Sequence, residues 1–237
     1  MASSSSRDKS IVVSALALLL AANIASAGEA SRRARSEEQE LVDHAQATLA
    51  RFRGDPRLNG FRENEGRARA VLIIPKAVRA GLVFGGSGGP GVVLARSGGS
   101  WNGPSFYTLG TASFGVQLGV DVSEIVVLVM TQRGLDALLS PSVRTGMDAS
   151  ISAGPVGIGA GRPARPDTDF VYYSRCKGFY GGVSLAGARI RPDPEANAAY
   201  YGRLASARDI LVRGSFHTAR ANRLIETAEG SVRVARH

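Results

Sequence analysis

Few residues of this chain have the types and spacing that catalysis requires, and the most suggestive lie in one glycine-rich stretch. Gly86-Ser-Gly-Gly-Pro-Gly91 matches G-x-G-x-x-G, in which glycines let a dinucleotide pyrophosphate approach the N-terminus of a helix. Here Pro90 interrupts the pattern, and a run typical of a strand follows instead of a helix. We therefore predict a glycine-rich hairpin turn and no bound nucleotide.

The same glycines surround Ser87 in a G-x-S-x-G match, the pattern of a serine nucleophile on a strand-to-helix elbow. Asp209 and His217 follow in the order that such a triad needs, but no helix is expected directly after the serine. Ser174-Arg-Cys-Lys177 matches S-x-x-K, without the S-D-N and K-T-G elements found with it in penicillin-recognising enzymes. A hydrolase that uses Ser87 remains an alternative function that serine-directed probes can test.

Metal ligands and reactive thiols are equally scarce. The histidines are His44, His217 and His237, and none has a second ligand at helical spacing. Cys176 is the sole cysteine, and no base that could activate it is identifiable. We expect no metal, no cofactor and no enzymatic activity.

The N-terminal sequence and the charge distribution indicate export and an anionic partner. Residues 1–27 combine a basic start, an apolar run and the A-x-A site Ala25-Ser-Ala27, so we expect a signal peptide followed by one exported domain, 28–237, periplasmic or secreted. The net charge is +9, and residues 162–237 carry thirteen bases against seven acids. Such a surface suits phospholipid headgroups or nucleic acid, and export favours phospholipid. Codon bias on an ordinary solvated surface is the alternative explanation.

Short β-branched runs separated by glycines, from Val71 to Ile190, predict an antiparallel, barrel-like β core. The expected strands include 124–130, 151–159, 170–174 and 179–190. Trp101 lies in a predicted turn between two strands, where it either closes the end of the barrel or stands exposed as an interfacial anchor.

Helices are expected around this core, which makes the fold class α+β with flanking helices. Hydrophobic spacing predicts a helix over 36–53, begun by Ser36 with Gln39 and ended at Gly54. Pro75 predicts the first turn of a short helix. Thr131 and Asp193 are predicted N-caps of two further helices, and the tail beyond residue 214 is expected to be helical or frayed.

Several segments, in order, resemble the SYLF domain family over about residues 35–213: 74–86, 91–96, 101–105, 114–119, 124–129, 177–187 and 197–202. The resemblance implies an α+β domain with a barrel-like core and a non-enzymatic role in binding anionic phospholipids, which are phosphoinositides in eukaryotic members. Fungal members are known as actin-binding modules. With an export signal in place of an SH3 or zinc-binding module, this chain resembles stand-alone bacterial envelope members, for which phosphatidylglycerol, cardiolipin and lipopolysaccharide phosphates are candidate anions.

The resemblance and the charge pattern suggest lipid contacts at Arg51, Arg53, Lys76, Arg79 and Trp101. The helix that ends with Arg51 and Arg53 corresponds in position to a family helix implicated in membrane contact. Each base held near an anionic surface contributes about 1 kcal/mol at most, so a few of them predict reversible, salt-sensitive attachment. The second function we consider is a structural or protein-interaction component of the envelope.

Overall fold

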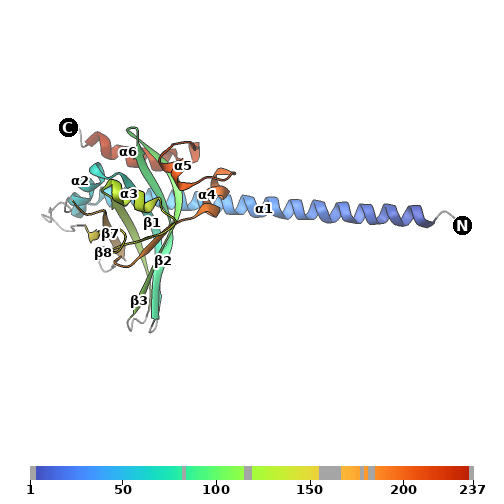
Figure 1. Cartoon of the computed structure of the whole chain (residues 1–237), viewed down its shortest axis with the longest axis horizontal. Coiled ribbons are helices and arrows are strands. Elements are labelled where there is room, and N and C mark those ends of the chain that lie inside the picture. The colour runs from blue at the N-terminus through green and yellow to red at the C-terminus, as the bar shows by residue number, and fades with distance from the viewer. Residues whose placement is uncertain are drawn as a thin grey trace.

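The computed structural model describes residues 4–81, 84–114, 119–154, 167–176, 179–180 and 185–234. It contains helices and strands in the mixture that the α+β prediction requires (Figure 1). In chain order the elements are α1 (Ser4–Gly54), η1 (Pro56–Leu58), α2 (Asn59–Arg67), β1 (Ala70–Gly81), β2 (Phe84–Ser97), β3 (Ser100–Phe114), β4 (Gly119–Val129), α3 (Gln132–Leu138), β5 (Val143–Arg144), β6 (Ile151–Ala153), β7 (Phe170–Cys176), β8 (Phe179–Tyr180), β9 (Arg189–Pro192), α4 (Pro194–Tyr201), α5 (Ala207–Leu211), η2 (Ala219–Ala221) and α6 (Asn222–Val234).

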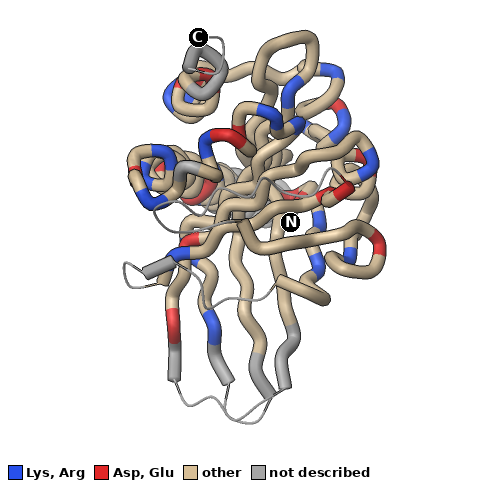
Figure 2. The backbone as a smooth tube through the Cα atoms, turned by 90° about the vertical axis from the view of Figure 1, so that its left-hand side faces the viewer, with Lys and Arg blue, Asp and Glu red and all other residues tan. Residues whose placement is uncertain are grey.

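The described strands form one curled sheet in the order β5-β9-β3-β2-β1-β4-β7-β6, and β8 pairs with β7. Every strand pair is antiparallel except β6 with β7. The predicted barrel-like core is confirmed as this curled sheet, whose two edges are β5 and β6. The long central strands β1 to β4 extend beyond the helices that cover the rest of the sheet (Figures 1 and 2).

Where helices cover the sheet, both of its faces are buried, which explains the uninterrupted apolar runs in β1 and β4. Val71 and Ile73 belong to the cluster formed with α1, α2, α4 and α6. Leu72 and Ile74 point to the opposite face and belong to the cluster formed with α3 and α5. We call these two sides the α1 face and the α3 face of the sheet.

Helix α1 is much longer than predicted, because it begins at Ser4 and runs through Ser36, so Ser36 is not an N-cap. The segment before Ser36 is rich in alanine, leucine and arginine and contains no proline, and these residues favour continued helix. The first part of α1 projects from the sheet and helices (Figure 1). Its end at Gly54 is as predicted. Among the described residues, no helix has the length and apolar character needed to cross a membrane.

The helix predicted at Pro75 is wrong, because Pro75 lies inside strand β1. The register of β1 shifts against β2 between Ile73 and Val78, and against β4 between Ile74 and Ala77. Proline has no N–H to donate, so it is tolerated in a strand where a bulge interrupts the hydrogen-bond ladder. The bulge also leaves Lys76 exposed.

The hairpin turn predicted over residues 86–91 is also wrong, since this stretch is the middle of β2. A Cβ atom on Gly88 would lie 2.2 Å from the carbonyl oxygen of Leu109 in β3. One on Gly89 would lie 2.2 Å from the carbonyl oxygen of Lys76 in β1. These glycines are therefore required by the close approach of neighbouring strands.

The caps predicted at Thr131 and Asp193 are confirmed. The hydroxyl of Thr131 accepts from the N–H of Gly134 at 3.0 Å, and the carboxylate of Asp193 accepts from the N–H of Ala196 at 3.0 Å. The predicted strands at 124–130 and 170–174 correspond to β4 and β7. The predicted strand 151–159 is β6 as far as Ala153, and residues 155–159 lie outside the described part. The predicted strand 179–190 is divided between β8 and β9.

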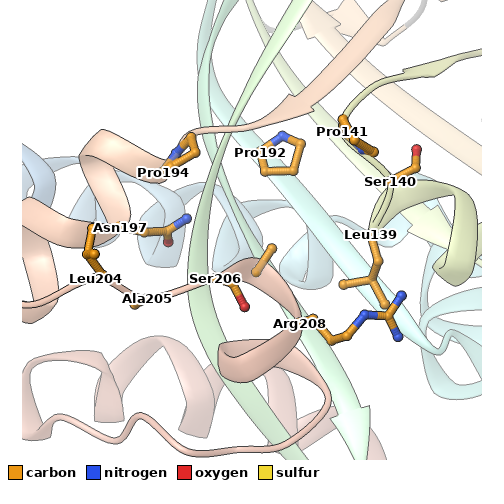
Figure 3. A pocket seen from close by; sticks show the side chains of 11 residues that line it. Leu139, Ser140, Pro141, Pro192, Pro194, Asn197, Leu204, Ala205, Ser206 and Arg208 are labelled. Carbon is orange, nitrogen blue, oxygen red and sulfur yellow. The ribbon is translucent and has the colours of Figure 1, made fainter.

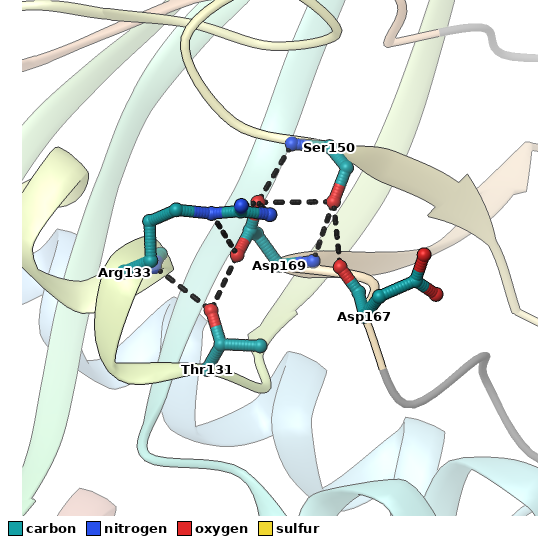
Figure 4. Close-up of polar contacts among 6 residues, drawn as sticks. Thr131, Arg133, Ser150, Asp167 and Asp169 are labelled. Carbon is teal, nitrogen blue, oxygen red and sulfur yellow. Dashed lines mark hydrogen bonds and ion pairs between the residues drawn. The ribbon is translucent and has the colours of Figure 1, made fainter.

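A buried carboxylate, Asp169, ties α3 to the starts of β6 and β7 (Figure 4). It accepts hydrogen bonds from the Thr131 hydroxyl, from the Arg133 guanidinium at 2.7 Å, and from both the N–H and the hydroxyl of Ser150 at 2.9 Å. Burial raises the pKa of Asp169, but these donors outweigh burial and lower it to about 2. Asp169 therefore stays ionised and holds three elements together.

Candidate functional site

The α1 face of the sheet becomes exposed where the central strands pass beyond the helices. Val122 lies four residues before Val126, which packs in the α1-face cluster, so both side chains point to that face. Val122 is 43% exposed, and its cross-strand partner Val78 in β1 is 36% exposed. An apolar pair at the centre of the sheet is thus open to solvent.

The strand register continues this pair into a row across six strands. Val78 is opposite Gly88, Gly88 is opposite Gly110, and Gly110 is opposite Arg189. Arg189 is in turn opposite Arg144 of the edge strand β5. We call these residues the open row: Arg144, Arg189, Gly110, Gly88, Val78 and Val122. Because cross-strand partners share a face, the open row joins two arginines, two residues without side chains and two valines on one surface.

The arginine end of the open row is an unusual concentration of positive charge. Arg144 and Arg189 are exposed and directly opposite each other, and Arg191 is exposed two residues further along the same face of β9. Their neighbours Val143 and Ile190 point into the α3-face core. Directly opposed like charges destabilise a strand pair. Within the described ranges, no ion pair with a carboxylate relieves the repulsion among these three arginines, so this edge can accept an anion.

The opposite face of the same strands is polar. Asp121, Arg79, Ser87 and Thr111 are consecutive cross-strand partners, and the Ser87 and Thr111 hydroxyls lie 2.6 Å apart. Figure 2 shows one acidic and one basic position on neighbouring strands of the part that extends beyond the helices. The predicted contact Arg79 therefore lies on the far side of the sheet from the open row.

Arg51 and Arg53, the first two predicted lipid contacts, both form ion pairs with carboxylates of the fold. Arg51 pairs with Glu124, which also receives Arg175 at 3.2 Å. Arg53 pairs with the buried carboxylate of Glu65 at 3.1 Å. Both guanidinium groups hold α1 in place, so neither is an independent cation for a ligand.

The remaining predicted contacts, Lys76 and Trp101, differ in their exposure to solvent. Lys76 is exposed at the bulge of β1 and is available to an anion. Trp101 lies in β3 rather than in a turn, is only 3% exposed, and packs beneath the guanidinium of Arg96 at 4.6 Å. The exposed-anchor role considered for Trp101 is therefore excluded.

Sequence reasoning missed Arg144, Arg189 and Arg191, although it identified the basic excess of residues 162–237, which include Arg189 and Arg191. The alternation of arginine and isoleucine in Arg189-Ile-Arg191 is a strand signal with one outward face. The position of Arg144 opposite Arg189 depends on pairing between distant segments, which spacing along the chain does not show.

Glu65 is a buried ionisable group on α2, which packs on the α1 face. Its side chain is fully buried beside Arg53 and Arg96. Burial raises the pKa of Glu65 to about 7, and the two guanidinium groups only partly offset that effect. This carboxylate supports the packing of α2 and is not part of the open row.

The arrangement of the described residues does not support the hydrolase alternative. Ser87 lies in mid-strand and continues into more strand, whereas a nucleophile elbow requires a following helix. Cys176 is half-buried at the end of β7. Across the described ranges, no three His, Cys, Asp or Glu side chains gather as metal ligands.

The chain is similar to known proteins over more than half of its length. Residues 110–231, just over half of the chain, match the family described as "Ysc84: Las17-binding protein actin regulator". The chain is 35% identical over 154 residues to LAS seventeen-binding protein 3 of Saccharomyces cerevisiae, covering 61% of this chain and 33% of that protein. It is 32% identical over 151 residues to Protein YSC84 of the same yeast, covering 61% and 32%.

A human relative shows similar coverage. The chain is 30% identical over 159 residues to SH3 domain-containing YSC84-like protein 1 of Homo sapiens, covering 65% of this chain and 46% of that protein. The chain thus spans less than half the length of these curated relatives. No solved structure matches it.

Proposed function

The chain belongs to the Ysc84 family, also called the SYLF family, and we propose that it is a non-enzymatic binding domain whose open row docks on an anionic phospholipid surface. The relatives are named for binding or for their domains and not for a reaction. That naming agrees with the expectation of a non-enzymatic role.

The observation that carries this proposal is the composition of the open row. A bilayer presents phosphates above hydrocarbon, and a complementary protein surface presents cations beside an exposed apolar patch. Val78 and Val122 supply the apolar patch. Gly88 and Gly110 lie between the valines and the arginines and have no side chains that would project from the surface there. Arg144 and Arg189 of the open row, together with the neighbouring Arg191, would contribute about 3 kcal/mol at about 1 kcal/mol each, which favours reversible, salt-sensitive attachment.

The cellular setting is part of the same proposal. If residues 1–27 direct export, the surface that the open row meets is an envelope membrane. The candidate anions are then phosphatidylglycerol, cardiolipin and lipopolysaccharide phosphates. Lys76, exposed at the bulge of β1 two residues before Val78, is a further cation near the open row.

Protein binding is the second candidate function, and the names of the relatives favour it. The matching family is described as Las17-binding, and its yeast members include LAS seventeen-binding protein 3. In this chain the arginine end of the open row would then dock an acidic protein surface in place of lipid phosphates.

Vesicle co-sedimentation of the full chain tests the proposal. We expect binding to vesicles that contain phosphatidylglycerol, none to vesicles of phosphatidylcholine alone, and loss of binding at 1 M salt, where the screening length is about 3 Å. Absence of binding to anionic vesicles at low salt would reject the lipid proposal and leave the protein-partner function. Equal binding to both vesicle types would reject the role of the arginines.

A further inference from the structure

A pocket of about 360 Å³ lies between the segment after α3, the end of β9, the start of α4 and the segment that leads into α5 (Figure 3). Its walls are mainly apolar and include Leu139, Pro141, Pro192, Pro194 and Leu204. Leu204 is 89% exposed, an unusual state for a leucine that lines a cavity. The volume lies within the range of small-molecule sites.

One polar group of the pocket, the side-chain amide of Asn197, has an unused donor. Asn197 is fully buried, and its Oδ1 accepts from the N–H of Phe106 at 2.9 Å and from the Ser105 hydroxyl at 3.3 Å. The backbone donor fixes which amide atom is oxygen, so Nδ2 is the remaining donor. Among the residues that the structure describes, Nδ2 is buried without a hydrogen-bond partner, and Figure 3 shows the amide pointing among the lining side chains. Buried donors are normally satisfied, so this one indicates an acceptor from a ligand.

Arg208 supplies the second polar feature. It lines the pocket from α5, is exposed, and forms no ion pair among the described residues. The hydroxyl of Ser206 is already used, because it accepts from the N–H of Asp209 at 3.1 Å and donates to the Asp209 carboxylate at 2.6 Å. The pocket therefore offers an exposed cation, a buried neutral donor and an apolar wall.

We propose that this pocket binds a single-chain lipid that carries a phosphate and an ester carbonyl. The phosphate contacts the Arg208 guanidinium, the carbonyl accepts from Asn197 Nδ2, and the acyl chain lies along the proline and leucine side chains. None of these residues belongs to the open row, so the site is independent of the proposed membrane surface. A peptide fits less well, because its backbone N–H groups need acceptors. The two available polar side chains of the pocket, Asn197 and Arg208, offer only donors.

The test compares three soluble short-chain ligands by calorimetry and by NMR of the Asn197 side-chain amide. They are a 1-acyl-glycerol phosphate, its 1-alkyl ether analogue without the carbonyl, and the monoacylglycerol without the phosphate. We expect the ester phosphate to bind with a shift of the Asn197 amide signals. The ether and the dephosphorylated ligand should each bind about tenfold more weakly.

Arg208→Ala should weaken binding of the ester phosphate about tenfold and leave binding of the monoacylglycerol unchanged. Arg223→Ala on α6, also an exposed arginine, is the matched control and should change neither. Equal affinity for ester and ether with an unmoved Asn197 signal would overturn the proposal. Absence of binding by all three ligands, or an Asn197 shift produced only by acidic peptides, would also overturn it. The ligand comparisons need no variant, so a folding defect cannot obscure them.

Discussion

Replacing Arg189 by glutamate should weaken membrane binding and, at the same time, preserve or raise the stability of the fold. Arg189 lies between Arg144 on the edge strand and Gly110 in β3, on the α1 face, and its side chain is exposed. A change from arginine to glutamate alters the charge of the open row by two units. It also converts an opposed pair of like charges into an opposed pair of opposite charges.

The substitution should weaken vesicle binding but preserve or raise the free energy of unfolding, and both changes can be estimated. Two charge units at about 1 kcal/mol each give about 2 kcal/mol of lost attraction, or about 30-fold weaker binding to anionic vesicles at low salt. Cross-strand charge pairs contribute about 0.2–1 kcal/mol, so the free energy of unfolding should stay constant or rise by up to about 1 kcal/mol. A substitution that merely damaged the fold would lower both quantities.

Co-sedimentation at several lipid concentrations, paired with thermal unfolding in solution, measures both quantities. Arg223→Glu is the matched control, because Arg223 is exposed on α6 and the substitution changes the net charge equally. Equal weakening by both variants would show that overall charge, and not the open row, governs binding. A melting temperature for Arg189→Glu several degrees below that of the unmodified chain would refute the opposed-arginine geometry itself.

Three further predictions test other parts of the structure. Val122→Asp should weaken vesicle binding even at high salt while the free energy of unfolding changes by less than about 0.5 kcal/mol, and unchanged binding would remove the apolar patch from the site. Asp169→Asn should lower the free energy of unfolding by about 3 kcal/mol in urea titrations, because donors that meet a carboxylate would meet an amide. The exposed control Asp136→Asn should cost less than about 0.5 kcal/mol, and equal losses would contradict the network. Because the folded pKa of Glu65 is about 7, above an unfolded value of about 4.3, stability should fall as pH rises between these values. Burial also raises the pKa of Glu38 to about 7, so Glu65→Gln should reduce that dependence without removing it in urea titrations at pH 5 and pH 8, and an unchanged slope would assign it to another group.

The parts of the fold that sequence predicts are those set by neighbouring residues. Thr131 and Asp193 cap helices through contacts three residues away, and the apolar run of β4 identifies a buried strand. The prediction at Pro75 was wrong because it used only local preference. Proline favours a helix start, but here β1 pairs with strands on both sides. Ser36 satisfies the local rule for a cap, but the residues before it continue the helix.

The candidate site was harder to predict, because it depends on strand register and on distant charge partners. Arg51 looks like a free cation at a helix end, but its carboxylate partner Glu124 is 73 residues away in the sequence. Arg144 and Arg189 are unremarkable separately and become a site only when β5 pairs with β9. Composition indicated a basic last third, and only the register showed which arginines share a surface.

Protection of the sheet edge is a competing explanation for these arginines, and the two explanations differ in one respect. Charged side chains on an edge strand discourage aggregation with another chain, and β5 is an edge. That protective role is served by either sign of charge and does not require like charges on adjacent strands, which destabilise the pair. An anionic surface requires positive charge specifically. Arg189→Glu keeps a charge on the row and reverses its sign, so unchanged solubility with lost vesicle binding would favour anion recognition over edge protection.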